Sequence, residues 1–183
     1  VLPFYHIYGM TVILNSALSH GATVVCMSRF DLEQFLVLMQ KHEVTRAHLV
    51  PPIVLALAKH PMVEGYAFPK LKTIMSGAAP LGPELAEDCA RRLGCTVKQG
   101  YGLTETSPVT HLNPEPPGRV IPGSIGICIP NTECRIVDYE TGKDLGTGMQ
   151  GELWIRGPQV MRGYLNNEEA TNPVSYTHLT LPT

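Results

Sequence analysis

The chain has 183 residues, of which 44% are hydrophobic and 16% are charged, and its formal net charge at pH 7 is −2. This length allows one domain with a hydrophobic core, and the composition excludes a disordered polyelectrolyte. A net charge so close to zero gives no general attraction to nucleic acid or to an anionic membrane. No apolar run approaches the roughly 18 residues of a membrane span.

The cysteine content indicates a reducing compartment. The number of cysteines is odd, none of them forms a CxxC pair, and no histidine spacing completes a zinc pattern. The chain also begins without a signal-peptide pattern. We therefore expect reduced, mostly buried thiols in a cytoplasmic protein. The five are Cys26, Cys89, Cys95, Cys128 and Cys134.

Helix and strand patterns alternate to about residue 100. Helices are expected at residues 10–20, 31–42, 53–60 and 84–93, and strands at 22–27, 45–50, 71–75 and 95–99. Asp31 followed by Gln34 is a capping-box-like start, Pro51 and Pro52 suit a first helical turn, and Gly94 ends the last helix. This alternation predicts an α/β fold with a mostly parallel sheet flanked by helices.

The pattern changes towards the C-terminus. Short strands are expected at 124–129, 132–137 and 151–156 with no helix between them, which predicts a small β-rich, barrel-like subdomain. We therefore divide the chain into an α/β part at 1–115 and a β-rich subdomain of the same domain at 116–171. Residues 172–183 fit no pattern, and we expect them to be a non-native or disordered tail.

Residues 98–106, Lys-Gln-Gly-Tyr-Gly-Leu-Thr-Glu-Thr, follow a predicted strand. The glycines allow close backbone approach, and Tyr101 between them can offer a flat face to a purine. Thr104 could donate to a phosphate oxygen, and Glu105 could hold Mg²⁺, which prefers oxygen ligands. A glycine-rich turn that closes a strand explains the same residue types.

Two other segments have a possible ligand-binding role. Residues 76–82, Ser-Gly-Ala-Ala-Pro-Leu-Gly, lie between a predicted strand and helix, where α/β sheets bind ligands, although an ordinary loop has this composition too. No GxxxxGK[ST] is present, which disfavours a Walker-type ATPase. In residues 1–9, Val-Leu-Pro-Phe-Tyr-His-Ile-Tyr-Gly, His6 can change charge near neutral pH or can simply pack beside the aromatic residues.

Together these strings resemble motifs of the adenylate-forming superfamily, which includes acyl-CoA synthetases, luciferases and peptide-synthetase adenylation domains. QGYGLTE at 99–105, SGAAPLG at 76–82, HIYG at 6–9 and the segment 151–165 occur in the family order and are most similar to those of 4-coumarate–CoA ligases. The resemblance extends to about residue 171. It implies an internal fragment of the AMP-binding domain, without the upstream phosphate loop, the ribose-binding Asp and the C-terminal domain with its catalytic Lys.

The resemblance also implies roles for individual residues. His6 would gate the acyl pocket, Thr104 would bind a phosphate oxygen, and Glu105 would hold Mg²⁺. Arg29 matches a position associated with the CoA phosphate, where the family usually has Lys, and a solvated surface Arg explains it equally well. The remaining nucleotide-binding residues would be Gly77, Ala78, Ala79, Pro80, Gln99, Gly100, Tyr101 and Gly102, and the acid pocket would be lined by Tyr8, Ala79, Gly100 and Leu112.

The implied activity is that of an ATP-dependent acid–thiol ligase. A carboxylic acid, here a 4-coumarate-like aromatic acid, is activated as an acyl-adenylate with release of pyrophosphate and is then transferred to CoA. The cofactors would be ATP, Mg²⁺ and CoA, and the partners the acid and the missing parts of the same enzyme, with no nucleic acid and no integral membrane segment. A fatty acyl–CoA ligase, a luciferase-like enzyme and a non-catalytic nucleotide-binding fragment are the alternatives. We expect the fragment alone to be inactive.

Overall fold

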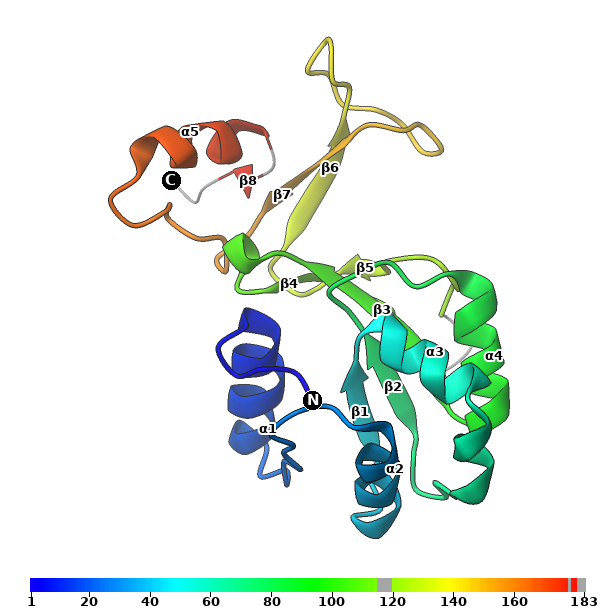
Figure 1. Ribbon diagram of the computed structural model, residues 1–183. Coiled ribbons are helices and arrows are strands. Elements are labelled where there is room, and N and C mark those ends of the chain that lie inside the picture. The colour runs from blue at the N-terminus through cyan, green and yellow to red at the C-terminus, as the bar shows by residue number, and fades with distance from the viewer. Residues whose placement is uncertain (115–119, 178, 181–183) are drawn as a thin grey trace. The chain divides into compact units, whose positions relative to one another are not determined.

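The computed structural model describes residues 1–114, 120–177 and 179–180, and Figure 1 shows its helices and strands. The chain forms two compact units. The first comprises Val1–Tyr101 and Leu112–Ile127, and the second comprises Gly102–His111 and Cys128–Thr183. Within the described ranges, no helix is both long and apolar enough to cross a membrane.

The first unit has the predicted α/β architecture. Strands β1 (Arg46–Leu49), β2 (Thr73–Ser76) and β3 (Thr96–Gly102) are parallel neighbours, and they belong to a five-stranded sheet with the order β1-β2-β3-β4-β5. Strands β4 (Val109–Leu112) and β5 (Ile127–Cys128) span the boundaries of the two units, so Val109–His111 and Cys128 belong to the second unit. The helices are η1 (Tyr8–Asn15), α1 (Ser16–Ser19), α2 (Leu32–Lys41), α3 (Pro51–Lys59), η2 (Pro61–Gly65) and α4 (Pro83–Leu93). Figure 1 shows α3 and α4 packed side by side against the sheet.

Local signals explain where these helices begin and end. The Asp31 carboxylate accepts a hydrogen bond from the Gln34 amide at 2.8 Å, which caps α2 as predicted. Two prolines occupy the first turn of α3, and Gly94 ends α4 with a left-handed φ of 64°. One apolar core joins these helices to the strands, and its fully buried members include Leu36, Leu49, Val54, Leu57 and Ile74.

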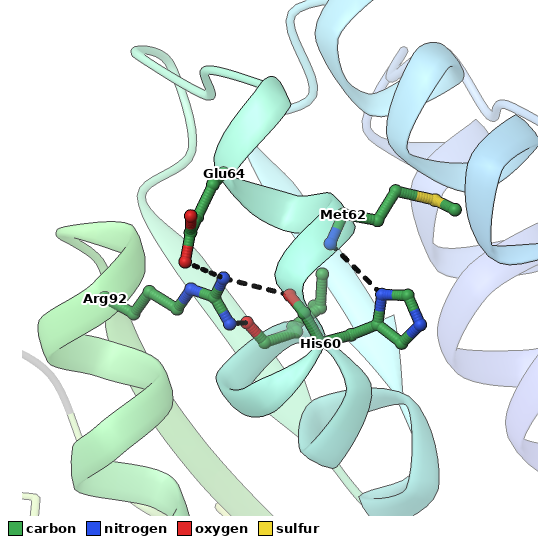
Figure 2. A network of polar contacts seen from close by, with 5 residues as sticks. His60, Met62, Glu64 and Arg92 are labelled. Atoms are coloured by element: carbon green, nitrogen blue, oxygen red, sulfur yellow. Dashed lines mark hydrogen bonds and ion pairs between the residues drawn. The ribbon is translucent and has the colours of Figure 1, made fainter.

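Arg92 on α4 binds the C-terminal end of α3, as Figure 2 shows. Its guanidinium donates to the carbonyl of His60 at 2.9 Å and to that of Leu57 at 3.4 Å, and it lies 3.5 Å from the Glu64 carboxylate. The last carbonyls of a helix have no partner within the helix, so a cation at this end satisfies them and complements the helix dipole. This contact holds the C-terminal end of α4 against the C-terminal end of α3.

The second unit is built on a β-hairpin. Strands β6 (Glu133–Val137) and β7 (Glu152–Arg156) are antiparallel, and β8 (Leu179–Thr180) pairs parallel to β7. The unit also contains η3 (Thr104–Thr106) and α5 (Glu168–Thr177). Its buried apolar residues are few and include Val137, Ile155 and Val160. The hairpin confirms the predicted strands at 132–137 and 151–156.

Three sequence predictions differ from the structure. The predicted strand at 22–27 is wrong, since no strand is assigned there and its residues are exposed or half-buried. A β-branched run becomes a strand only where another strand pairs with it, and propensity alone does not supply that partner. Strand β3 continues through Gly102, so the Gly-Tyr-Gly segment is part of a strand rather than a turn. The predicted strand at 124–129 is reduced to β5.

The C-terminal tail was expected to be non-native or disordered. Within 172–183, the structure assigns residues up to Thr177 to α5 and assigns Leu179–Thr180 to β8. Residue 178 and residues 181–183 lie outside the described residues. The proposed foreign origin of this segment therefore stays a prediction.

Candidate functional site

Tyr8 connects the HIYG segment to the ends of β1 and β2. Its buried ring meets the ring of His48 edge-on, with 5.8 Å between the centroids. The Tyr8 hydroxyl lies 3.2 Å from His48 Nδ1 and 3.4 Å from the carbonyl oxygen of Met75. A Cβ atom added to Gly77 would lie 2.9 Å from the Tyr8 ring. The glycine thus leaves the space in which the tyrosine packs, and two of the sequence motifs meet at this point.

Burial favours the neutral forms of both Tyr8 and His48. Desolvation raises the pKa of Tyr8 well above its ordinary value, so the phenol keeps its proton. Desolvation, followed by the positive charge of Arg46, lowers the pKa of His48, which favours the neutral imidazole near pH 7. No pattern in the sequence singles out His48, which occupies one position of a four-residue strand. A neutral, partly aromatic wall suits an uncharged ring better than a charged group.

His6 lies on the surface at the start of the same segment. Its Nδ1 accepts a hydrogen bond from the Tyr8 backbone amide at 3.1 Å. A Cβ atom on Gly9 would lie 2.2 Å from the carbonyl oxygen of Pro3, so only glycine fits this turn. His6 is therefore attached to the backbone that positions the buried Tyr8.

The SGAAPLG segment forms the loop between β2 and α4. Ala78, Ala79 and Pro80 are exposed at its tip, whereas Gly77 is buried beside Tyr8. Ala78 adopts a positive φ of 68°, a conformation that costs about 1 kcal/mol or more for a residue with a side chain. Ser76 Oγ is buried and has no hydrogen-bond partner among the described residues. A strained loop with an unpaired buried hydroxyl is typical of ligand-binding positions.

Gln99 on β3 holds this loop. Its side-chain carbonyl oxygen accepts a hydrogen bond from the Leu81 amide at 3.1 Å. The backbone of Gln99 pairs with Asn113, donating to Asn113 Oδ1 at 2.7 Å and accepting from Asn113 N at 3.0 Å. Asn113 in turn donates to the carbonyl of Ser124 at 3.1 Å. The loop, the end of β3 and the segment after β4 are therefore joined by buried hydrogen bonds, and the sequence analysis missed Asn113 because a single Asn after a strand has no distinguishing pattern.

The other predicted residues of the first unit differ in position and exposure. Gly100 and Tyr101 are half-buried near the end of β3, and Leu112 is half-buried at the end of β4. Arg29 is exposed in the segment before α2. Within the first unit, Tyr8, Gly77 and Gln99 are predicted residues whose contacts connect separate motifs.

In the second unit, Glu105 is held by the segment that contains the GYL string. Its carboxylate accepts a hydrogen bond from the Tyr164 hydroxyl at 2.5 Å, and its backbone carbonyl accepts from the Met161 amide at 2.8 Å. The hydrogen bond to Glu105, with smaller contributions from burial and from the carboxylate charge, raises the pKa of Tyr164. Thr104 beside it is exposed. A carboxylate and a hydroxyl in one turn present the hard oxygen donors that Mg²⁺ and phosphate-bound ions prefer.

The turn that presents these two side chains is closely packed. A Cβ atom on Gly102 would lie 1.9 Å from the carbonyl oxygen of Pro108, so the backbone approaches more closely than any side chain allows. Thr106 is fully buried, and its hydroxyl accepts from the Leu103 amide at 3.0 Å and donates to the Pro108 carbonyl at 2.5 Å. These bonds turn the chain back after β3 and place Thr104 and Glu105 at the bend.

The family model described as "AMP-binding enzyme" matches residues 1–165. The chain is 47% identical to 4-coumarate–CoA ligase 1 of Solanum tuberosum over 176 residues, which cover 93% of this chain and 32% of that protein. It is 43% identical to the probable 4-coumarate–CoA ligase 1 of Dictyostelium discoideum, covering 95% of this chain and 32% of that protein.

This chain is also similar in fold to experimentally solved structures. The ATP-bound crystal structure of MatB from Rhodopseudomonas palustris has a TM-score of 0.85 at 31% identity, with 94% of this chain and 34% of that chain covered. The chain spans about a third of the length of the curated relatives it matches. The match to the family model covers most of the sequence and all four motif segments. The chain therefore belongs to the AMP-binding enzyme family.

Proposed function

We propose that this chain supplies the acyl-binding and nucleotide-binding core of an ATP-dependent acid–thiol ligase that acts on an aromatic acid such as 4-coumarate. The observation that carries the proposal is the hydrogen bond from the Leu81 amide to Gln99, which ties the SGAAPLG loop to the strand leading into the QGYGLTE motif. Identity of 47% to a relative named 4-coumarate–CoA ligase supports the same chemistry. The chain spans about a third of that relative, so the activity belongs to a longer protein.

The acid would bind against the neutral surface formed by Tyr8 and His48. An aromatic ring gains from edge-to-face contact with another ring and from removal of its apolar area from water. Gly77 has no side chain and so admits the Tyr8 ring, while Ala79, which has a small side chain, would line the acid pocket together with Gly100 and Leu112. A protonated, positively charged His48 would favour a charged ligand instead, but the lowered pKa of His48 favours its neutral form.

Adenylation would then follow in the longer protein. The substrate carboxylate attacks the α-phosphorus of ATP, the bond to the bridging oxygen breaks, and pyrophosphate leaves. Tyr101 would stack on the adenine, Gln99 and the SGAAPLG loop would shape its pocket, and Thr104 would donate to a phosphate oxygen. Glu105 would hold Mg²⁺, which neutralises phosphate charge when bound. Such reactions depend on positioning and on charge stabilisation more than on covalent help.

Thioester formation would complete the reaction. The CoA thiol gives up its proton to solvent and attacks the acyl carbonyl, the acyl–phosphate bond breaks, and AMP leaves with the electron pair. His6, exposed and hydrogen-bonded to the backbone of Tyr8, would gate access to the pocket between the two steps. Arg29, an exposed cation, would contact a CoA phosphate. We further propose that the protein acts in the cytoplasm and that the 183-residue chain alone lacks useful turnover, because the other parts of the enzyme supply the phosphate loop and the catalytic Lys.

The proposal is tested by ATP–pyrophosphate exchange in the longer protein that carries this segment, with cinnamic, benzoic, fatty and amino acids as substrates. Exchange with hydroxycinnamic acids that Glu105→Ala abolishes is the expected result. Exchange with fatty acids or amino acids alone would contradict the aromatic substrate and keep the reaction class. A folded protein that exchanges with no acid, yet shows a rise in melting temperature with ATP and Mg²⁺, would support the non-catalytic alternative.

A further inference from the structure

Two cysteines and a histidine come together in the second unit. The proposed reaction assigns no role to any of the three. His111 lies on β4, Cys128 on β5 and Cys134 on β6. Cys128 Sγ is 3.4 Å from His111 Nε2 and 3.2 Å from Cys134 Sγ. All three candidate ligand atoms lie within 4.8 Å of one another.

These spacings suit a tetrahedral zinc ion. Zinc binds Cys sulfur at about 2.3 Å and His nitrogen at about 2.0–2.1 Å, so tetrahedral ligand atoms stand roughly 3.6–3.8 Å apart. The two observed separations, 3.2 and 3.4 Å, are a few tenths of an ångström shorter. Small movements of the side chains would therefore open the coordination sphere, with no rearrangement of the strands.

The histidine is already oriented for this role. His111 Nδ1 lies 2.9 Å from the hydroxyl of Thr110, so Nε2 is the nitrogen directed at Cys128. A hydrogen bond to the other ring nitrogen is the usual way in which a protein orients a metal-binding histidine. Thr110 and His111 are both buried, which holds this geometry in place.

The cluster is accessible from solvent on one side. Cys134 is exposed and Cys128 is half-buried, so the expectation of mostly buried thiols is wrong for Cys134, as it is for the exposed Cys26. Cys134 also borders a hollow of about 210 Å³ that is lined by β6 and β7 residues, including Arg135 and Trp154. An ion can therefore enter, and a water molecule can occupy the fourth position that three protein ligands leave open.

We propose that His111, Cys128 and Cys134 form a zinc-binding site with three protein ligands. No spacing in the sequence indicates this site, because the ligands come from three strands and have neither the C-x2–4-C nor the H-x3–5-H spacing of zinc fingers. A bound ion would connect β4, β5 and β6 and would stabilise a unit that has few buried apolar residues. The competing use of the two thiols is a Cys128–Cys134 disulfide, which leaves His111 without a role.

The test uses cobalt as a spectroscopic substitute for zinc in the full 183-residue chain, purified with a reductant and then freed of metal with a chelator. We expect one Co²⁺ per chain, thiolate-to-cobalt charge-transfer absorption, and loss of that absorption when Zn²⁺ is added. Because zinc binds the thiolate form of cysteine, zinc binding should also be accompanied by the release of protons.

Single substitutions identify the ligands. Cys134→Ser changes an exposed side chain and should leave the circular dichroism spectrum unchanged while it weakens zinc binding at least roughly 100-fold, more than the loss of an outer-shell contact. Cys128→Ser and His111→Gln should have the same effect. Cys26→Ser removes an exposed thiol of the first unit and is the matched control, for which zinc affinity should equal that of the unmodified chain.

Three results would overturn the proposal. The first is a reduced, folded chain that shows no cobalt–thiolate absorption. The second is absorption that persists unchanged in Cys134→Ser. The third is a chain that contains the Cys128–Cys134 disulfide by mass spectrometry and still fails to bind metal after the disulfide is reduced.

Discussion

Each of the two units is stabilised internally by a different kind of interaction. In the first unit, fully buried aliphatic side chains such as Leu36, Leu57 and Ile74 form one continuous core between helices and strands. In the second unit, few apolar side chains are buried, and polar contacts such as those of Thr106 and Tyr164 define the turn that carries Glu105. Packing thus determines the stability of the first unit, and a small number of hydrogen bonds determines the geometry of the second.

The largest effect should come from a cavity in the first core. Leu57→Ala removes a fully buried side chain of α3 and should lower the free energy of unfolding by about 2–5 kcal/mol. Leu55→Ala on the same helix is the control, because Leu55 is 49% exposed. Urea denaturation followed by far-ultraviolet circular dichroism measures both. Equal losses in the two variants would show that α3 does not pack as described.

The corresponding change in the second unit acts on the backbone. Gly102→Ala places a Cβ atom against the Pro108 carbonyl and should cost about 1–3 kcal/mol, the range of overpacked substitutions. Trp154 is the single tryptophan and lies in the second unit, so its fluorescence reports this transition. Gly146→Ala is the control, since a Cβ atom there meets nothing within 4 Å. A Gly102 variant as stable as the Gly146 variant would contradict the close approach.

The hydrogen bond that holds the SGAAPLG loop offers a sharper comparison. Gln99→Ala leaves the buried Leu81 amide without its acceptor, which should cost about 1–3 kcal/mol. Hydrogen exchange at Leu81 should accelerate as the loop opens. Gln40→Ala is the control, because Gln40 accepts from the Ala67 amide at 2.8 Å in an exposed position where water can replace it. Unchanged exchange at Leu81 would show that Gln99 does not hold the loop.

The smallest effect concerns the exposed Tyr164–Glu105 contact. The raised pKa of Tyr164 means that its neutral form is favoured in the folded state. The stabilisation that the Tyr164–Glu105 hydrogen bond gives the folded state is therefore fully present below the ordinary tyrosine pKa of about 10. It is lost as pH rises through the higher pKa of the folded state. The stability difference between the unmodified chain and Tyr164→Phe, followed by Trp154 fluorescence, should shrink at high pH. Tyr139→Phe, which removes a hydroxyl from a more exposed tyrosine of the same unit, is the control.

What the sequence predicted correctly depends on interactions between close neighbours in the chain. The Asp31 cap, the prolines of α3 and the Gly94 stop act within one helical turn, and the structure confirms them. The apolar run at 22–27 has strand composition, yet pairing with another strand is a property of the whole sheet and not of the run.

The contacts of the candidate site join residues that are distant in the sequence. Tyr8 meets His48 and Met75, and Glu105 meets Tyr164, and no local pattern marks such partners. The cluster of His111, Cys128 and Cys134 could not be predicted from the sequence for the same reason. Zinc-finger patterns describe ligands that are close together in the sequence, whereas these three lie on separate strands. The roles assigned to Thr104, Glu105 and Arg29 come from the family resemblance and stay predictions.

The most direct test of the account is the magnesium dependence of ATP–pyrophosphate exchange in the longer protein with Glu105→Gln. Glu140→Gln, which removes an exposed carboxylate from a hairpin turn of the same unit, is the matched control. We predict that Glu105→Gln slows exchange by about 100-fold, the scale of losing one charge-stabilising group, and that it raises the Mg²⁺ concentration required. Glu140→Gln should match the unmodified protein. Equal rates and equal magnesium requirements in the two variants would contradict the proposed role of Glu105.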